Sequence, residues 1–251
     1  MDRAASFYAQ QGQWLDAYNG DVQEQDHEQA ATIEWLAGPG SKRVLELGAS
    51  GGHAAAATAA LGHRVTALEL VPAAAQYAQQ LATRVSYGSL TVIQADFYTV
   101  QLPECFDVVC YWDGFGIGAD ADQHRLLARI RQWLVPGGCA LIDILTPWYW
   151  AATVGREMCI GEATRRYDFD ADGCRMLDRW WPTGDETQAI VQSLRCYSPA
   201  DLRLLMRGTG LRLQSVEAGG MMDYETMRYH KHVPLRQAMG YTVKLVIDDA
   251  V

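Results

Sequence analysis

One segment constrains the fold more than any other: a short apolar run, Arg43 to Leu47, that ends in the glycine-rich turn Gly48-Ala49-Ser50-Gly51-Gly52. An alanine-rich stretch from His53 to about Leu61 follows, and Gly62 is placed to end a helix there. A strand, a glycine turn and a helix in this order bring a ligand close to the backbone and to the helix N-terminus. The segment therefore predicts a ligand-binding α/β unit.

The alternation of apolar strands and helices continues to about residue 145. Further strands are predicted at 65–70, 90–94, 106–112 and 139–145, with helices at 71–84 and 120–134. Strands that alternate with helices through short loops form a parallel, doubly wound sheet, whose ligands bind at the edge where the strands end. We therefore expect the α/β class, with the functional site at that edge.

The pattern changes after about residue 146. Residues 164–169 and 175–181 alternate in polarity around Asp172-Gly173, which predicts an antiparallel hairpin, and 188–197 predicts a further strand. A helix should begin at Ser198, and two last strands are expected at 211–216 and 241–247. We divide the chain into an N-terminal helical lid (1–40), a ligand-binding core (41–146), an antiparallel substrate cover (147–197) and a C-terminal completion of the core sheet (198–251).

Composition narrows the partners that the chain can have. The formal net charge is −9, with 21 Lys and Arg against 30 Asp and Glu. Nucleic acids are bound by clustered basic residues, so we expect no nucleic-acid partner, and Arg165-Arg166 is interpreted as a solvated strand face. No apolar run approaches the roughly 18 residues of a membrane-spanning helix, and the Gln-rich N-terminus does not resemble a signal peptide. The expected location is the cytoplasm, without a membrane partner.

Neither a disulfide framework nor a metal site is predicted. The 6 cysteines are dispersed without a C-x-x-C pair, and Cys110 and Cys139 lie in apolar segments, as reduced thiols of a core do. His230 and His232 are separated by one residue and have no nearby pattern of acids to complete a metal site.

The turn at the end of the first strand carries a more specific signal. Glu46-Leu47-Gly48-Ala49-Ser50-Gly51-Gly52 resembles the E/D-x-G-x-G-x-G loop of class I (Rossmann-like) S-adenosylmethionine-dependent methyltransferases of the small-molecule type, with Ser50 in place of the middle glycine. Glu69, Asp96-Phe97, the strand Phe106 to Trp112 and the turn Leu134-Val135-Pro136-Gly137-Gly138 match the same family in the same order. The resemblance implies a seven-stranded, mostly parallel sheet in the order 3-2-1-4-5-7-6, with the hairpin inserted after strand 5.

The resemblance also implies a site for S-adenosylmethionine, which leaves as S-adenosylhomocysteine. In that family the methionine part lies over the glycine loop, an acid at the position of Glu69 takes both ribose hydroxyls, and residues at the positions of Asp96 and Phe97 read and cover the adenine. The residues expected to bind the cofactor are Glu46, Gly48, Ala49, Ser50, Gly52, Glu69, Leu70, Asp96, Phe97 and Trp112.

The substrate side is inferred from position alone. Asp113 lies just past the fourth strand, where it could orient the substrate or act as a base, or equally hold the cofactor's amino group or cap the loop. The aromatic run Trp148-Tyr149-Trp150 could line a pocket for a flat or cationic substrate, or pack the insertion. We expect Asp113 and Tyr149 to be catalytic, and Phe115, Trp148, Trp150 and Tyr18 to bind the substrate.

These features together predict a methyltransferase that moves a methyl group to N or O of a small molecule in specialised metabolism. The sulfonium is already an activated donor, so the protein must mainly position a nucleophile, and a base is needed only for a protonated one. Two alternatives stay open. One is a cofactor-binding relative without methyl transfer, either a cyclase or a binding partner. The other is a nicotinamide-dependent oxidoreductase, although the loop does not fit G-x-G-x-x-G.

Overall fold

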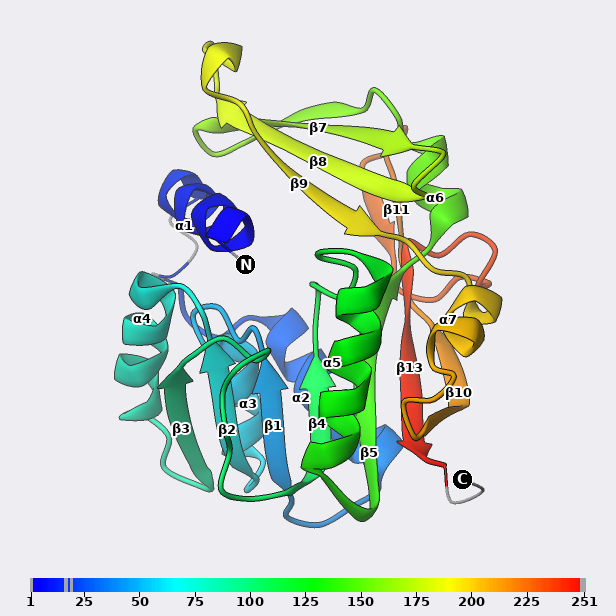
Figure 1. Cartoon of the computed structure of the whole chain (residues 1–251). Coiled ribbons are helices and arrows are strands. Elements are labelled where there is room, and N and C mark those ends of the chain that lie inside the picture. The colour runs from blue at the N-terminus through cyan, green and yellow to red at the C-terminus, as the bar shows by residue number, and fades with distance from the viewer. Residues whose placement is uncertain (1, 16–17, 19, 249–251) are drawn as a thin grey trace.

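A seven-stranded sheet forms the base of the molecule. The computed structural model describes residues 2–15, 18 and 20–248, and Figure 1 shows the sheet with the first strands at one end and the last strands at the other. The order is β10-β13-β5-β4-β1-β2-β3, in which β1 to β5 are parallel and β13 is antiparallel to both of its neighbours. The predicted order 3-2-1-4-5-7-6 is thereby confirmed. The strands are β1 (Arg43–Leu47), β2 (Arg64–Glu69), β3 (Ser89–Gln94), β4 (Phe106–Tyr111), β5 (Leu134–Leu145), β10 (Leu211–Ala218) and β13 (Gly240–Ile247).

Helices cover both faces of this sheet, which explains why its central strands are almost continuously apolar. On one face lie α2 (Glu24–Ala37) and α3 (His53–Ala60), whose Ile33 and Ala55 are fully buried in one cluster. On the other face lie α5 (Asp120–Trp133) and α7 (Pro199–Leu205). Helix α4 (Pro72–Ala82) packs against β2 and β3.

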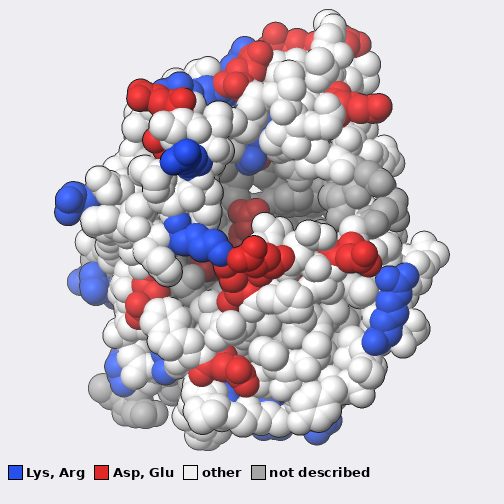
Figure 2. Space-filling model, turned by 180° about the vertical axis from the view of Figure 1, so that it is seen from behind, with Lys and Arg blue, Asp and Glu red and all other residues white. Residues whose placement is uncertain are grey.

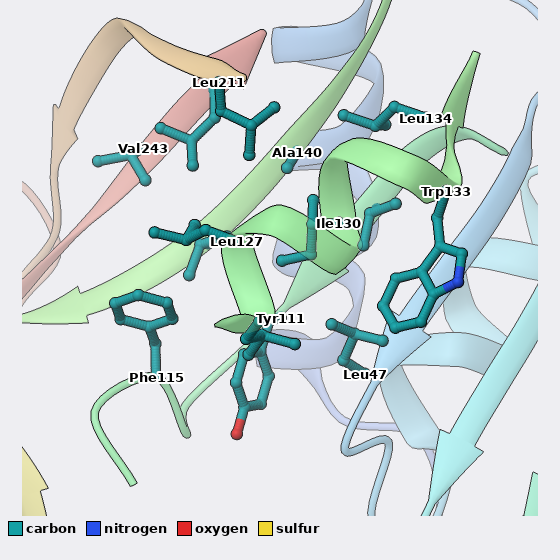
Figure 3. Close-up of a cluster of buried hydrophobic side chains, with 14 of the residues drawn as sticks. Leu47, Tyr111, Phe115, Leu127, Ile130, Trp133, Leu134, Ala140, Leu211 and Val243 are labelled. Carbon is teal, nitrogen blue, oxygen red and sulfur yellow. The ribbon is translucent and has the colours of Figure 1, made fainter. Parts of the chain in front are cut away.

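The larger core cluster lies under α5. Figure 3 shows Leu127 and Ile130 of α5 directed toward Ala140 and Val243 of the sheet. These side chains are fully buried, and burying a Leu or Ile side chain contributes roughly 1.5–3 kcal/mol. The cluster fixes the direction in which β4 and its following loop leave the sheet.

A second sheet stands above the edge where the parallel strands end (Figure 1). It is antiparallel and consists of β6 (Glu157–Ile160), β7 (Ala163–Asp170), β8 (Arg175–Pro182) and β9 (Ile190–Arg195). The predicted hairpin corresponds to β7 and β8, and the strand predicted at 188–197 corresponds to β9. Helix α6 (Pro147–Ala152), the 3-10 turn Glu186–Gln188, strand β6 and the small hairpin of β11 (Met221–Asp223) and β12 (Arg228–His230) were not predicted.

Helix α1 (Asp2–Leu15) lies between the two sheets at one side (Figure 1). Its Phe7 is buried against Ala163 and Trp180 of the second sheet, and Tyr8 and Trp14 pack on the same cluster. The N-terminal helix therefore connects the second sheet to the base of the molecule.

The interpretation of Arg165-Arg166 as a solvated face was wrong for Arg165. Neighbouring residues of a strand point to opposite faces, and the Arg165 side chain is 23% exposed on the face that turns toward α1. Its Nε and Nη2 donate to the two carboxylate oxygens of Asp178 at 2.6 and 2.8 Å. The guanidinium lies over the rings of Tyr167 and Trp180, at 4.4 and 4.8 Å from their centres. This charge is tolerated inside because it is paired and stacked.

Candidate active site

A cavity of about 390 Å³ lies where β1, β2 and β4 end, beneath α1. Seen from behind, the molecule is hollowed between its lower body and the second sheet, with acidic side chains around the floor of the hollow (Figure 2). Ten of the residues predicted to form the site line this cavity: Glu46, Gly48, Ala49, Ser50, Glu69, Leu70, Phe97, Trp112, Asp113 and Tyr18.

The glycine turn owes its shape to three positions with a positive φ angle, at every second residue. Gly48 and Gly52 have φ angles of 64° and 79°, and Ser50 has a φ of 49°. A Cβ on Gly52 would lie 2.7 Å from the Cβ of Ala78, so this glycine is required for close packing with α4. Gly52 is not among the residues that line the cavity, and its role is to form the turn. Ser50 adopts the left-handed conformation that the family's middle glycine would favour.

Glu69 connects the glycine turn to the end of β2. Its Oε2 accepts a hydrogen bond from the Ser50 N–H at 2.7 Å, and its Oε1 accepts one from the Val71 N–H at 2.6 Å. Burial raises the pKa of this carboxyl, and the backbone N–H groups of Val71, Ser50 and Leu70 oppose the rise. Each carboxylate oxygen keeps a further lone pair, so Glu69 can accept two hydroxyl groups from a ligand in the cavity.

Two polar groups of residues that line the cavity, one on Glu46 and one on Trp112, have no hydrogen-bond partner among the described residues. Glu46 is 2% exposed, and its Oε2 is buried without a hydrogen bond to any described residue. The Trp112 Nε1 donor is also buried without a hydrogen bond to a described residue. Burial and the neighbouring Asp26 raise the pKa of the Glu46 carboxyl to about 8. Buried polar groups are normally paired, so an unpaired acceptor and an unpaired donor in one cavity indicate a ligand that carries both complements.

Asp113 occupies the part of the cavity nearest the second sheet. Its φ of 42° is unusual for a non-glycine residue, and such strain is often kept at functional positions. The Asp113 side chain is exposed where it lines the cavity, and desolvation by the surrounding protein raises the pKa of its carboxyl. Arg165 opposes the rise and Asp178 adds to it. Asp113 therefore belongs to a small charged group that spans the loop after β4 and the second sheet.

The loop after β4 is also attached to the second sheet through its backbone. The Gly116 carbonyl accepts a hydrogen bond from the Arg195 N–H at 2.9 Å and from Arg175 Nη2 at 3.1 Å. A Cβ on Gly116 would lie 2.4 Å from the Arg195 carbonyl oxygen, so only glycine permits this approach. The position of Asp113 consequently depends on how the second sheet is placed.

Two residues assigned to the site lie beside the cavity rather than in its wall. Asp96 precedes the cavity-lining Phe97, and its Oδ1 accepts the Tyr98 N–H at 2.8 Å. Phe115 is 1% exposed, packs against Tyr197, and points into the core under α5 (Figure 3). The loop turns between Asp113 and Phe115, which places the first residue in the cavity and the second in the core.

The aromatic run of α6 does not face the cavity, contrary to the expected arrangement. Trp148 Nε1 donates to the Leu235 carbonyl, Tyr149 Oη to the Met222 carbonyl, and Trp150 Nε1 to the Met239 carbonyl, each at 2.9 Å. The rings pack with Tyr167 and Met176 of the second sheet. Helical rotation directs all three polar tips toward the C-terminal segment, so these residues hold the second sheet to the rest of the chain.

Several residues of the cavity wall were not assigned to the site from the sequence. Helix α1 contributes Tyr8 and Gln11, helix α2 contributes Asp26 and Gln29, and His53 begins α3. Asp26 lies three residues after Gln23, whose N–H it accepts at 2.7 Å, and this spacing is that of a helix cap. This capping pattern does not reveal that the Asp26 side chain also lines the cavity.

Comparison with known proteins decides the identity of the central part. Residues 44–138 match the family described as Methyltransferase domain. They are a class I S-adenosylmethionine-dependent methyltransferase domain. The match covers β1 to the start of β5, which is the part that carries the glycine turn, Glu69 and Asp113. A nicotinamide-dependent oxidoreductase is thereby excluded.

Solved structures extend the likeness of this methyltransferase over the whole fold. The CcbJ methyltransferase from Streptomyces caelestis has a TM-score of 0.70 at 19% identity, over 92% of this chain and 99% of that one. The glycopeptide N-methyltransferase MtfA has a TM-score of 0.61 at 21% sequence identity, over 91% of this chain and 93% of that one. The amino pentose methyltransferase CalS10 from Micromonospora echinaspora has a TM-score of 0.58 at 19% sequence identity, over 96% of this chain and 95% of that one. At these identities the likeness establishes the fold. The curated proteins compared by sequence give no match.

The cofactor of this family, S-adenosylmethionine, fits the unpaired groups of the cavity. Its amino-acid end carries an ammonium, which complements the Glu46 carboxyl, and a carboxylate, which can accept from Trp112 Nε1. Its ribose hydroxyls suit the free lone pairs of Glu69, and Phe97 supplies an apolar surface for a flat ring. No helix in the described part of the chain is long and apolar enough to cross a membrane.

Proposed function

We propose that this methyltransferase transfers a methyl group to an amine nitrogen of a small molecule, with Asp113 as the group that accepts the proton. The carrying observation is the position of Asp113, which lines the cavity and is influenced by the charges of Arg165 and Asp178 of the second sheet. Tyr8 lies beside the same group and lines the cavity.

The electrostatics of the cavity wall favour a cationic or amine substrate. Among the lining residues within the described chain, four are acids (Asp26, Glu46, Glu69 and Asp113) and none is Lys or Arg. A wall of one sign raises the local concentration of ligands of the opposite sign. An anionic substrate and a polyanionic partner such as a nucleic acid are both disfavoured for the same reason.

The chemistry requires little more than positioning and one base. The bound cofactor supplies a methyl group that is already activated by its sulfonium. A substrate nitrogen would take this methyl group and leave S-adenosylhomocysteine as the other product, and the Asp113 carboxylate would accept the proton lost from nitrogen. A carboxylate whose pKa is raised by desolvation holds such a proton better than a carboxylate at its ordinary pKa does.

The size of the cavity and the names of similar structures support a small substrate in natural-product biosynthesis. A volume of about 390 Å³ is within the range of small-molecule sites. MtfA is described as an N-methyltransferase of glycopeptides and CalS10 as an amino pentose methyltransferase that is involved in calicheamicin biosynthesis. The N-terminal helix and the second sheet would then form the lid and the cover of the acceptor side.

Product analysis with a cofactor that carries a deuterated methyl group tests the proposal. A panel of primary and secondary amines is assayed beside alcohols of matched skeleton, and products are identified by mass. We expect label on nitrogen and release of S-adenosylhomocysteine in equal amount. Label on oxygen alone would overturn the choice of nitrogen. Recovery of only intact cofactor and cyclised or unmodified acceptor would favour a relative without methyl transfer.

A further inference from the structure

Two buried carboxylates, Asp26 and Glu46, line the cavity close enough to influence each other, and none of the described residues that line it is Lys or Arg. Glu46 of β1 is 2% exposed and Asp26 of α2 is 7% exposed, and both line the cavity. Asp26 uses its Oδ2 to accept the Gln23 N–H, while Glu46 makes no hydrogen bond to a described residue. Carboxylates this deeply buried are normally paired with a positive group.

The described residues around Glu46 do not provide that positive group. Cys110 of β4 lies beside it, and burial raises the pKa of this thiol far above its ordinary value, so the thiol stays neutral. Glu69 of β2 and Asp113 of the loop after β4 line the same cavity and add negative charge. The His53 ring of α3 also lines it, with Nε2 2.9 Å from the Gly20 carbonyl oxygen.

We propose that Asp26 and Glu46 together form an anionic seat for the ammonium of the cofactor, and that binding of the cofactor expels a proton from this pair. Asp26 is thereby a cofactor-binding residue supplied by a helix outside the matched domain, which begins at residue 44. The seat explains why α2 places a carboxylate on the cavity side of its first turn.

The direction of the proton movement follows from the free protein. Burial first, and Asp26 second, raise the pKa of Glu46 to about 8, so near neutral pH the empty seat holds its proton. An ammonium beside Glu46 favours the ionised form and lowers that pKa. Binding at neutral pH therefore releases up to one proton, and the affinity rises about tenfold per pH unit until Glu46 is ionised in the free protein as well.

The contribution of Asp26 can be separated from its role as a helix cap. Asp26→Asn keeps an acceptor oxygen for the Gln23 N–H but removes the charge. Without the charge, Glu46 loses the neighbour that helps to keep it protonated, so its proton is lost at lower pH. Asp26→Asn should therefore reduce both the proton release and the electrostatic attraction for the ammonium.

Calorimetric titration with S-adenosylhomocysteine in two buffers of different ionisation enthalpy measures both quantities. The parent should release a proton at about pH 7 and bind about tenfold more tightly for each unit of pH up to about 8. Glu46→Gln should abolish the release. Asp26→Asn should release fewer protons at about pH 7 and bind about tenfold more weakly at about pH 9, which lies above the pKa of Glu46 in the free parent.

Two further variants make the outcome decisive. Asp21→Asn removes an exposed acid that does not line the cavity and should behave as the parent. Asp26→Glu keeps the charge and should retain the release if Asp26→Asn proves unstable in thermal unfolding. An affinity that does not change with pH in the parent would overturn the proton coupling. A release and an affinity that are the same in Asp26→Asn as in the parent would remove Asp26 from the seat.

Discussion

The two ends of the cavity use buried acids in opposite ways. At the cofactor end, Asp26 and Glu46 have no cation among the described residues that line the cavity. At the acceptor end, Arg165 is fixed by two hydrogen bonds to Asp178 and by two flanking rings, and its charge also acts on the Asp113 carboxyl. At the cofactor end the ligand itself must supply the positive charge, so binding of the cofactor should be coupled to the release of a proton. The second end carries its own positive charge, which keeps Asp113 available as a base.

Replacing Asp113 should give the largest effect on turnover. Asp113→Asn preserves the shape of the side chain but cannot accept a proton, and loss of a general base lowers rates by roughly 100-fold to 10,000-fold. S-adenosylhomocysteine affinity should stay close to that of the parent, because the cofactor end is unchanged. Steady-state kinetics and calorimetry together check this separation of the two ends.

Two comparisons keep this prediction falsifiable. Glu162→Gln removes an exposed acid at the tip of the β6–β7 hairpin and should leave turnover unchanged. In the parent, the rate should fall as the pH drops through the raised pKa of Asp113, because only the carboxylate accepts the proton. An Asp113→Asn variant with parental kcat would mean that the amine arrives already neutral and needs no base.

Replacing Glu69 should affect the other end and spare the chemistry. Glu69→Ala removes the acceptor for two ligand hydroxyls and also leaves the Ser50 and Val71 N–H groups without their partner. Hydrogen bonds to a charged group contribute about 1.5–3 kcal/mol each, so S-adenosylhomocysteine should bind about tenfold to a hundredfold more weakly. Glu69→Gln, which can still serve one of the backbone donors, should lose less. Equal affinity in Glu69→Ala and the parent by calorimetry would contradict the assignment.

The charge of Arg165 should set the pH range of activity. Arg165 opposes the rise in the pKa of Asp113, so its removal in Arg165→Met should raise that pKa further and move the acid limb of the rate profile to higher pH. Turnover should fall severalfold near neutral pH and recover in alkaline buffer. Arg165→Lys keeps the charge and should keep the profile near its original position. A structural role alone would lower the rate at every pH, without this shift.

The sequence predicted those parts of the site that depend on local backbone form. The glycine turn, the acid at the end of β2 and the order of the strands follow from short patterns, because a positive φ and an apolar strand leave direct signatures in the residues. Arg165 shows what a local sequence pattern does not predict. In the sequence it is one of two adjacent arginines of a polar strand, and only the register of β7 with β8, together with the cover of α1, turns it inward.

The same limit explains the errors on the acceptor side. Asp113 and Phe115 are two residues apart, yet one faces the cavity and the other the core, because the loop turns sharply at a residue with positive φ. The aromatic run after β5 was assigned to the cavity by its position in the chain. The side chains of this run point instead toward the C-terminal segment, because of the way in which α6 packs on it. No local sequence pattern predicts that packing.

Replacing Tyr149 should have the smallest effect on turnover, and it tests whether the acceptor end of the cavity extends to α6. Its hydroxyl donates to the Met222 carbonyl at 2.9 Å, and the side chain is 8% exposed, so Tyr149→Phe leaves a largely buried acceptor without its donor. The expected loss of stability is about 1 kcal/mol, which corresponds to a fall in Tm of roughly 2–4 °C for a chain of this length. Turnover at a temperature well below the Tm should stay within about twofold of the parent, because a hydrogen bond outside the cavity contributes nearly equally to the free and reacting enzyme. Thermal unfolding and initial rates measured on the same preparation separate these effects. A severalfold loss of turnover with an unchanged Tm would place Tyr149 at the reacting groups and extend the acceptor end to α6.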